Sequence, residues 1–286
     1  MQSPRSGNKG AVDGEKKVMA QHKTEIAQET EESEDRYRAP ALDKGLDILE
    51  ALAEREEGVS QAEIAKALGR KPNEIYRMLD RLVRRGYVIR SSVDQYELSL
   101  KLFELANRHS PFRRLTTQTL PHLRQFSRET QQACHLVVYD RGALTAIAQV
   151  DAPGYWGFGI RVGSRIGLLD TGSGHVMLAF SSASERESML RECEESPAGY
   201  VADELISVLG QVRRQGYEMM PSKQTEGVYN IAVPLFAASD KVIAVLACPY
   251  LQHLDSMGTP SREAVLGQLK YAARQIMAAT PGGAGE

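Results

Sequence analysis

The strongest constraint on the fold lies in the spacing of helix signals in residues 40–98. Ser60 and Glu63 are spaced as in a capping box, in which each side chain accepts a hydrogen bond from a backbone N–H group at the start of a helix. Gly69 is suited to end that helix and Pro72 to begin the next, because a proline at the first helical position loses no hydrogen bond. The sequence therefore predicts two short helices joined by a tight turn.

The flanking residues complete this unit. Apolar side chains at helical spacing predict helices at 42–55, at 61–68 and from Pro72 onward. Beyond the third helix, β-like runs at 87–90 and 95–98 flank a short polar turn and predict a hairpin. Three short helices and a terminal hairpin are the parts of a winged helix-turn-helix, which is a DNA-binding unit.

Charge is divided sharply within the same unit. Residues 43–65 carry seven acidic side chains against two basic ones, whereas residues 66–90 carry eight basic side chains against two acidic ones. The whole chain has 35 lysines and arginines against 37 acidic residues, so only a local face can attract DNA. A basic third helix fits the major groove, where arginine and asparagine bond base edges and neighbouring cations bond phosphates. The alternative is a small helical domain with a solvated charged face.

The side chains that we expect to contact double-stranded DNA lie on the outer face of the third helix or beside it. They are Ser60, Arg70, Lys71, Asn73, Glu74, Tyr76, Arg77, Arg81 and Arg90. Arg84 and Arg85 are further candidates for contacts with phosphates.

Other features bear on the compartment and on cofactors. Residues 1–38 are polar and have no sustained period, so we expect a disordered tail without a signal core. The longest apolar runs, such as 242–247, are far shorter than the ~20 residues of a membrane span. We therefore expect a cytoplasmic protein with no membrane partner. Cys134, Cys193 and Cys248 form no CxxC pair, so the sequence indicates neither a disulfide framework nor a metal site, and no cofactor is expected.

A second domain is predicted after a linker helix at 101–111, which Pro111 is expected to end. The expected helices of this domain are 115–130, 173–181, 184–194, 203–215 and 261–279, and its expected strands are 134–139, 144–150, 158–162, 217–220, 228–236 and 241–248. This order suits a sheet that packs against helices and is open on one side as a pocket.

Motifs in both halves resemble a single family. They are 41–50, 60–69, Ile75-Tyr-Arg-Met-Leu79 and Arg85-Gly-Tyr-Val88 in the first half, and Arg161-Val-Gly-Ser-Arg165, Thr171-Gly-Ser-Gly174, Arg214-Gln-Gly-Tyr217, Glu226-Gly-Val228 and Ile231-Ala-Val-Pro234 in the second. In their order and spacing they resemble the IclR family of bacterial transcriptional regulators over about residues 40–280.

The resemblance implies an α+β protein of two domains. A winged helix-turn-helix would occupy 39–100, a linker helix 101–111, and a GAF-like α/β effector-binding domain 112–280. It implies a homodimer or a dimer of dimers that binds a palindromic DNA operator and changes its grip when a small metabolite binds. The recognition positions would fall on 72–81, with Arg77 where the family commonly has arginine and Tyr76 where it often has histidine.

The resemblance also implies an effector pocket. Its expected residues are Trp156, Phe158, Ile166, Thr171, Gly172, Ser173, Gly174, Met220, Asn230, Val245 and Ala247. Members that bind small carboxylates often have cysteine at the position of Asn230 and lysine at that of His175, and they can carry aspartate or serine at those of Met220, Val245 and Ala247. These departures favour a larger ligand than a two-carbon acid, either a sugar-derived acid or an aromatic acid.

Two features of the second domain have alternative interpretations. The turn Thr171–Gly174 leads into an apolar helix, so its N–H groups can hold a carboxylate, or its glycines can serve the backbone alone. Trp156 is a pocket residue in one interpretation and a core or interface residue in the other. His135, beside Cys134, is expected to be a strand residue rather than a metal ligand.

Two other classes of function are alternatives to a transcriptional regulator. Asp170-Thr-Gly-Ser173 matches the active-site sequence of aspartic proteases, whose chemistry needs two carboxylates that share one proton. The chain has one copy, so a hydrolase would need a second Asp170 from a dimer partner. A third class is a DNA-binding structural protein without an effector. The sequence favours a transcriptional regulator that is not an enzyme.

Overall fold

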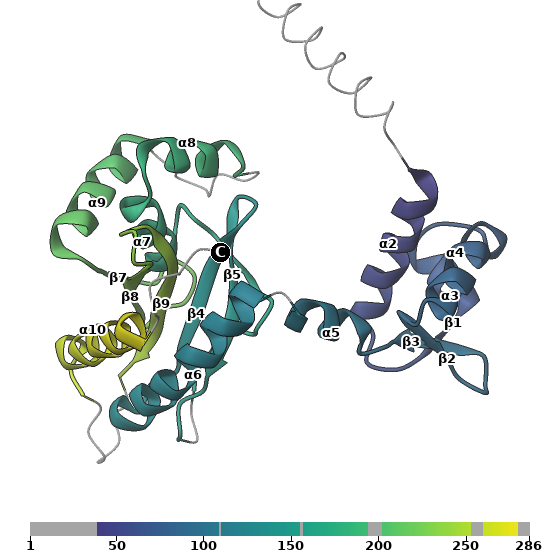
Figure 1. Ribbon diagram of the computed structural model, residues 1–286, viewed down its shortest axis with the longest axis horizontal. Helices are drawn as coiled ribbons and strands as arrows, with labels where there is room; N and C mark the ends of the chain where they lie inside the picture. The colour runs from purple at the N-terminus through teal and green to yellow at the C-terminus, as the bar shows by residue number, and fades with distance from the viewer. Residues whose placement is uncertain (1–38, 109, 155–156, 194–201, 253–259, 280–286) are drawn as a thin grey trace, which may run out of the picture. The chain divides into compact units, whose positions relative to one another are not determined.

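The computed structural model describes residues 39–108, 110–154, 157–193, 202–252 and 260–279, in two compact units that divide between Ala106 and Asn107 (Figure 1). The tail expected to be disordered, 1–38, lies outside the described residues. Within the described ranges, no helix is both long and apolar enough to cross a membrane.

Between Ala39 and Leu100, the first unit contains three helices and a small sheet. The helices are α2 (Pro40–Ala53), α3 (Gln61–Ala67) and α4 (Pro72–Arg84), and the strands are β1 (Val59–Ser60), β2 (Val88–Arg90) and β3 (Gln95–Leu98), in the order β1-β3-β2. The predicted helices and hairpin are confirmed. The sequence missed β1, because a strand of two residues has no period to detect.

Local chemistry explains where the helices of this unit begin. The Ser60 hydroxyl accepts the Glu63 N–H at 3.3 Å, and the Glu63 carboxylate accepts the Ser60 N–H at 2.8 Å, so the capping box is confirmed. Pro72 is at the start of α4, and Gly69 before it has φ +62°, a conformation that glycine adopts easily. The buried side chains that join these elements are Ile48, Leu52, Ile64, Ala65, Ile75, Leu79, Val88 and Tyr96.

The second unit is built on a six-stranded antiparallel sheet. The strands are β4 (Cys134–Asp140), β5 (Ala143–Val150), β6 (Arg165–Ile166), β7 (Glu218–Pro221), β8 (Val228–Phe236) and β9 (Val242–Leu251), in the order β6-β5-β4-β9-β8-β7. One face is covered by α6 (Ser110–Thr130) and α10 (Arg262–Ala279), and the other by α7 (Gly172–Phe180), α8 (Ala183–Arg191) and α9 (Ala202–Gln215) (Figure 1). The two-domain α+β fold class is confirmed.

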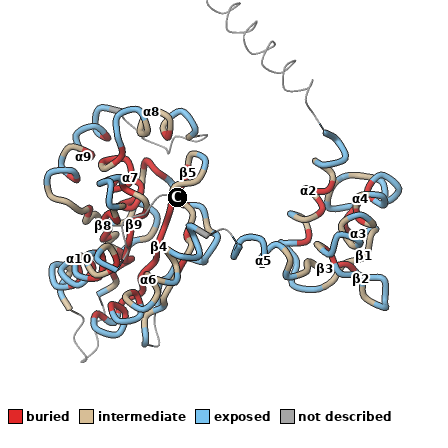
Figure 2. The backbone as a smooth tube through the Cα atoms, viewed as in Figure 1, coloured by how far each residue is buried: buried red, intermediate tan, exposed pale blue. Residues whose placement is uncertain are grey.

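The expectation of a sheet open on one side is wrong. Separate apolar cores lie on the two faces, one with Leu123 and Phe126 of α6 and the other with Val176 and Met177 of α7. The strands between them are buried over most of their length (Figure 2). Any ligand on the face of α7 must therefore lie among buried groups rather than on an open sheet.

Two local predictions are also wrong. No strand forms at 158–162, and pairing with β5 occurs instead at Arg165–Ile166, after Gly163 turns the chain with φ +90°. The linker helix α5 (Lys101–Arg108) ends before Pro111, which lies in the first turn of α6. Proline is compatible with that position, because the first N–H groups of a helix have no partner within it.

The turn between β4 and β5 is packed against the end of α8. Arg141 and Gly142 both have positive φ, and a methyl group on Gly142 would lie 2.1 Å from the carbonyl oxygen of Glu192. The Cys193 thiol donates to the Gly142 carbonyl at 3.2 Å.

Cys134 and Cys248 are buried, and burial raises the pKa of both thiols, so they remain protonated. All three cysteines are free.

This packing gives a stability prediction. We expect Gly142→Ala to lower the free energy of unfolding by more than about 2 kcal/mol, because it adds both a positive-φ penalty and a backbone clash. Gly267→Ala is the matched control: it lies within α10 with open space around it, and should raise that free energy by up to about 1 kcal/mol. Urea unfolding of both variants measures the difference. Equal stability would contradict the packing described.

Candidate DNA-binding and effector sites

The outer face of α4 is exposed as a strip of polar side chains. Ile75 and Leu79 hold the inner face in the core. The exposed side chains of α4 and its N-cap include Lys71, Asn73, Glu74, Tyr76, Arg77 and Arg81. The side chain of Tyr76 is about half exposed although it is aromatic. The structure thus brings these predicted DNA-contact residues together on one surface.

The cations of this region fall into two groups. Arg70 pairs with Asp47 at 2.9 Å, Arg84 with Asp80 at 2.9 Å, and Arg90 with Asp94 at 2.5 Å. The hydrogen bond to Asp94 raises the pKa of Arg90, so the arginine stays protonated. Its charge is balanced by that of Asp94. Among the described residues, no ion pair forms at Lys71, Arg77, Arg81 or Arg85. These four cations are available to an external anion.

Ser60 has a structural partner in this structure. Its N–H and hydroxyl both donate to the Glu63 carboxylate, at 2.8 and 2.7 Å. These contacts lower the pKa of Glu63 and keep the carboxylate charged. Gln61 donates to the Pro72 carbonyl at 2.9 Å, which links the starts of α3 and α4. Sequence reasoning did not identify this link.

The turn before α7 places backbone donors in a buried position. Thr171 caps the helix: its hydroxyl accepts the Gly174 N–H at 3.0 Å and donates to the Gly167 carbonyl at 2.6 Å. Gly172 and Ser173 are buried, and within the described ranges no acceptor is found for their N–H groups. A buried N–H without an acceptor is costly, so these two groups can serve an anion from outside the chain.

The glycines of this turn also have a packing role. A methyl group on Gly174 would lie 2.2 Å from the Leu168 carbonyl oxygen, and one on Gly172 would lie 3.2 Å from Cβ of Asn230. Close backbone packing therefore requires Gly174. It also brings the start of α7 against β8, where Asn230 pairs across the strands with Met220 of β7.

A buried hydrogen-bond pair fixes the start of α7. His175 Nδ1 lies 3.1 Å from Glu218 Oε2, and Nε2 lies 3.1 Å from the Leu169 carbonyl oxygen. Both side chains are buried. Sequence reasoning missed Glu218, since no local motif relates it to a histidine 43 residues away. The pair ties α7 to the edge strand β7.

The remaining predicted effector residues are more scattered. Ala247 of β9 pairs with Ala232 beside the Asn230 position, and Val245 is fully buried in the core under α7. Ile166 lies on β6, at the opposite edge of the sheet from β7, and pairs with Leu144 of β5. Phe158 is partly exposed after β5. Trp156 lies outside the described residues. The structure thus groups Thr171–Gly174, Met220 and Asn230, but not Ile166.

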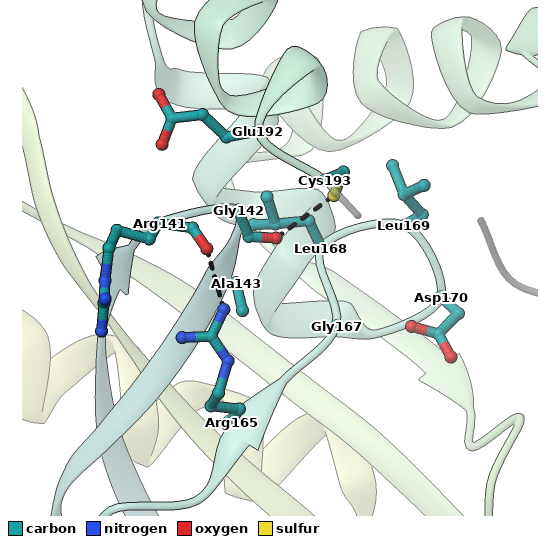
Figure 3. Close-up of a pocket in the computed structure, with 10 residues that line it drawn as sticks. All are labelled: Arg141, Gly142, Ala143, Arg165, Gly167, Leu168, Leu169, Asp170, Glu192 and Cys193. Atoms are coloured by element: carbon teal, nitrogen blue, oxygen red, sulfur yellow. Dashed lines mark hydrogen bonds between the residues drawn. The ribbon is translucent and has the colours of Figure 1, made fainter. Parts of the chain in front are cut away.

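Asp170 lies in a pocket of about 310 Å³ between the β4–β5 turn and the end of α8 (Figure 3). Its carboxylate accepts the Gln224 amide at 3.4 Å. Glu192, the other carboxylate of the pocket, accepts the Tyr139 hydroxyl at 2.7 Å and lies on the opposite side from Asp170 (Figure 3). Within this pocket, the two carboxylates do not form the proton-sharing pair that an aspartic hydrolase requires.

Comparison with known families agrees with this architecture. Residues 113–278 match the family model described as bacterial transcriptional regulator IclR C-terminal, and residues 41–92 match the IclR helix-turn-helix domain. The chain belongs to the IclR family. Members of this family are transcriptional regulators with a DNA-binding and an effector domain, and they are not enzymes. The hydrolase alternative is therefore set aside.

Individual relatives cover most of the chain. The HTH-type transcriptional regulator KdgR of Escherichia coli is 32% identical over 212 residues, which are 71% of this chain and 79% of KdgR. An IclR homolog from Microbacterium hydrocarbonoxydans, crystallised with 4-hydroxybenzoate, has a TM-score of 0.71 at 23% identity and covers 84% of this chain and 100% of that chain. The IclR of Thermotoga maritima has a TM-score of 0.67 at 23% identity, with coverage of 83% and 97%. The last two show that the fold is shared.

Proposed function

We propose that this IclR-type regulator binds an operator through α4 and that a sugar-derived or aromatic acid, bound at the start of α7, changes this binding. The observation that carries the proposal is the exposed face of α4 with cations that have no ion-pair partner in the described structure. A regulator of this kind acts on the bacterial chromosome, which favours a cytoplasmic location.

The two groups of cations suggest different roles on DNA. Arg77 and Asn73, exposed near the start of α4, are placed to read base edges. Lys71, Arg81 and Arg85 are free to neutralise phosphates. Arg84 is already paired with a carboxylate, so its contribution to DNA affinity should be smaller. We assign a similar minor role to the paired Arg70 and Arg90.

The effector proposal rests on the buried donors before α7. A carboxylate near the N–H groups of Gly172 and Ser173 would satisfy both and interact favourably with the helix dipole. Asn230, whose Cβ lies beside Gly172, offers both a donor and an acceptor to the rest of the ligand. The carboxylic acid bound by the Microbacterium homolog supports the same ligand class here.

A homodimer is part of the proposal. Leu42 and Leu46 are exposed one turn apart on α2, and Leu102 and Leu105 are exposed on α5. Apolar side chains gathered on helices in this way favour association. A second copy of this chain is the proposed occupant, because two recognition helices related by a two-fold axis match a palindromic operator.

The base-reading role of Arg77 can be tested on an operator selected from random duplexes. We expect Arg77→Ala to weaken binding by about 5- to 150-fold, equivalent to about 1–3 kcal/mol for one bidentate base contact. Arg84→Ala is the matched control on the same helix and should change affinity by less than about 3-fold, since Asp80 already neutralises that cation. Gel-shift titration compares them, and similar losses in both variants would reject Arg77 as a base reader.

The dimer proposal predicts a change of mass. Leu46→Glu should convert the protein to a monomer at micromolar concentration, because a charge would be buried in the interface. Ile206→Glu alters another exposed apolar side chain, on α9, and should leave the mass unchanged. Sedimentation equilibrium distinguishes the two. A dimeric Leu46→Glu protein would place the interface elsewhere.

The effector site predicts separation of two activities in the full-length protein. Ser173→Trp places a bulky side chain at the buried donors, and Asn230→Leu removes the neighbouring amide. Each variant should bind the operator as the wild type does but lose effector affinity by at least about 10-fold, because a ligand acts only through its different affinity for the two states. Calorimetry with an effector found by thermal-shift screening measures this. Unchanged effector affinity in both variants would show that the effector binds elsewhere in the protein.

A further inference from the structure

A row of side chains crosses the sheet on the face that carries α7. Strand register pairs Gln149 of β5 with His135 of β4, His135 with Ala247 of β9, Ala247 with Ala232 of β8, and Ala232 with Glu218 of β7. Paired residues on adjacent strands share a face. The row is therefore polar at both ends and has two alanines, the smallest side chains that can point into this face, in the middle.

The Gln149 and His135 end contains polar atoms without partners. His135 is 3% exposed, and its Nδ1 has no hydrogen bond within the described structure. The buried Gln149 Oε1 has none either. These two atoms belong to side chains that are direct cross-strand neighbours. Buried polar atoms in native proteins are nearly always hydrogen-bonded, so an unpaired pair at one place needs a physical explanation.

The hydrogen bonds that Gln149 already makes, and the charge state of His135, show which kind of partner each side chain lacks. The Gln149 amide nitrogen donates to Asp151 Oδ1 at 3.1 Å and to the Val150 carbonyl at 3.3 Å, which leaves Oε1 as the unpaired acceptor. Burial lowers the pKa of His135 to about 4, so the ring is neutral near pH 7 and carries one donor and one acceptor nitrogen. Gln149 Oε1 requires a donor, which a carboxylate cannot supply.

This end of the row lies next to the proposed effector site. Ala247 of β9 separates His135 from Ala232 of β8. Two residues along β8 from Ala232, on the same face of the sheet, is Asn230, which contacts the start of α7. From β8 to β4 is two strand spacings, or roughly 10 Å. The chain after β5 passes over the Gln149 end, since a methyl group on Gly159 would lie 2.5 Å from the Gln149 amide nitrogen. A ligand over the two alanines would thus be enclosed at both ends.

We propose that His135 and Gln149 bind a hydroxyl group of the effector, at the far end from its carboxylate. A hydroxyl donates its one proton to Gln149 Oε1 and accepts from His135 Nδ1–H, which satisfies both atoms at once when the neutral ring carries its proton on Nδ1. The carboxylate then lies at the N–H groups of Gly172 and Ser173. The inference rests on the proposed effector function and narrows its ligand to hydroxylated carboxylic acids, in which His135 and Gln149 select for the hydroxyl.

The test compares acids that differ only in hydroxyl groups. The probes are D-gluconate against hexanoate and 4-hydroxybenzoate against benzoate, each titrated into the full-length protein by calorimetry. We expect the hydroxylated member of at least one pair to bind at least about 10-fold more tightly, because a site with buried polar atoms rejects an analogue that leaves them unpaired.

Three variants assign the preference to residues. His135→Leu and Gln149→Met remove one unpaired atom each, and should reduce the preference for the hydroxylated acid to less than about 3-fold while the deoxy acid binds as before. Thr119→Val is the control, since it removes another buried unpaired oxygen, on α6. It should leave the preference unchanged. The melting temperature of ligand-free His135→Leu should equal or exceed that of the wild type, because an unpaired polar group is replaced by an apolar one.

The outcomes separate this inference from the function on which it rests. Loss of preference in His135→Leu and Gln149→Met, but not in Thr119→Val, supports it. Equal binding of the paired acids to the wild type, or a preference that survives in both variants, overturns it and leaves acid control of the operator standing. If no acid of the panel binds, both this inference and the acid-effector proposal fail, while operator binding is judged by its own titration.

Discussion

The buried start of α7 is the constraint on which the second unit depends. Every residue from Gly172 to Ala179 is buried, so the first N–H groups of this helix cannot be satisfied by water. Thr171 caps one of them, and the close approach of Gly174 to the Leu168 carbonyl fixes the path of the chain. What remains are the N–H groups of Gly172 and Ser173, for which the described structure holds no acceptor and which the proposed effector would satisfy.

The same burial explains why the proposed effector site combines residues from distant parts of the sequence. His175 on α7 is held by Glu218 on β7, and this contact places the helix start over β8 rather than elsewhere on the sheet. A ligand bound there would contact strands that enter the sheet from both ends of the domain. Ligand binding would therefore stabilise the arrangement of α7 on the sheet, not a single loop.

Local signals in the sequence predicted the helices and the hairpin of the first unit, but only part of the second unit. Ser60, Glu63, Gly69 and Pro72 act within one or two turns of each other, so their pattern predicted the helices of the DNA-binding unit. The row that contains His135 is created by strand register across five strands, which no short motif encodes. The false strand at 158–162 has an apolar alternation, but Gly163 turns the chain before it can pair.

The ion pairs of the DNA-binding unit also could not be predicted from the sequence. Composition predicted a basic face, yet it could not tell that Asp47, Asp80 and Asp94 each neutralise an arginine of that region. The effective charge of the face is thus smaller than the count of its cations. Fewer free cations would release fewer counterions on DNA binding, so in the proposed complex base contacts would carry a larger share of operator recognition.

The short helix α5 is the segment in which the chain passes from one unit to the other. It has eight residues, none of them buried, and isolated helices of this length are marginal in water. Within its own unit, Lys101 holds the start of this helix by donating to the Arg85 carbonyl, and in the proposed homodimer a second copy of the chain would cover Leu102 and Leu105. The division between the two units falls within α5, so the proposed effector response would have to pass along this helix. An effector that binds one state of the regulator 10-fold more tightly than the other contributes about 1.4 kcal/mol per site. With two sites in the proposed dimer, the equilibrium between the two states shifts by about 100-fold.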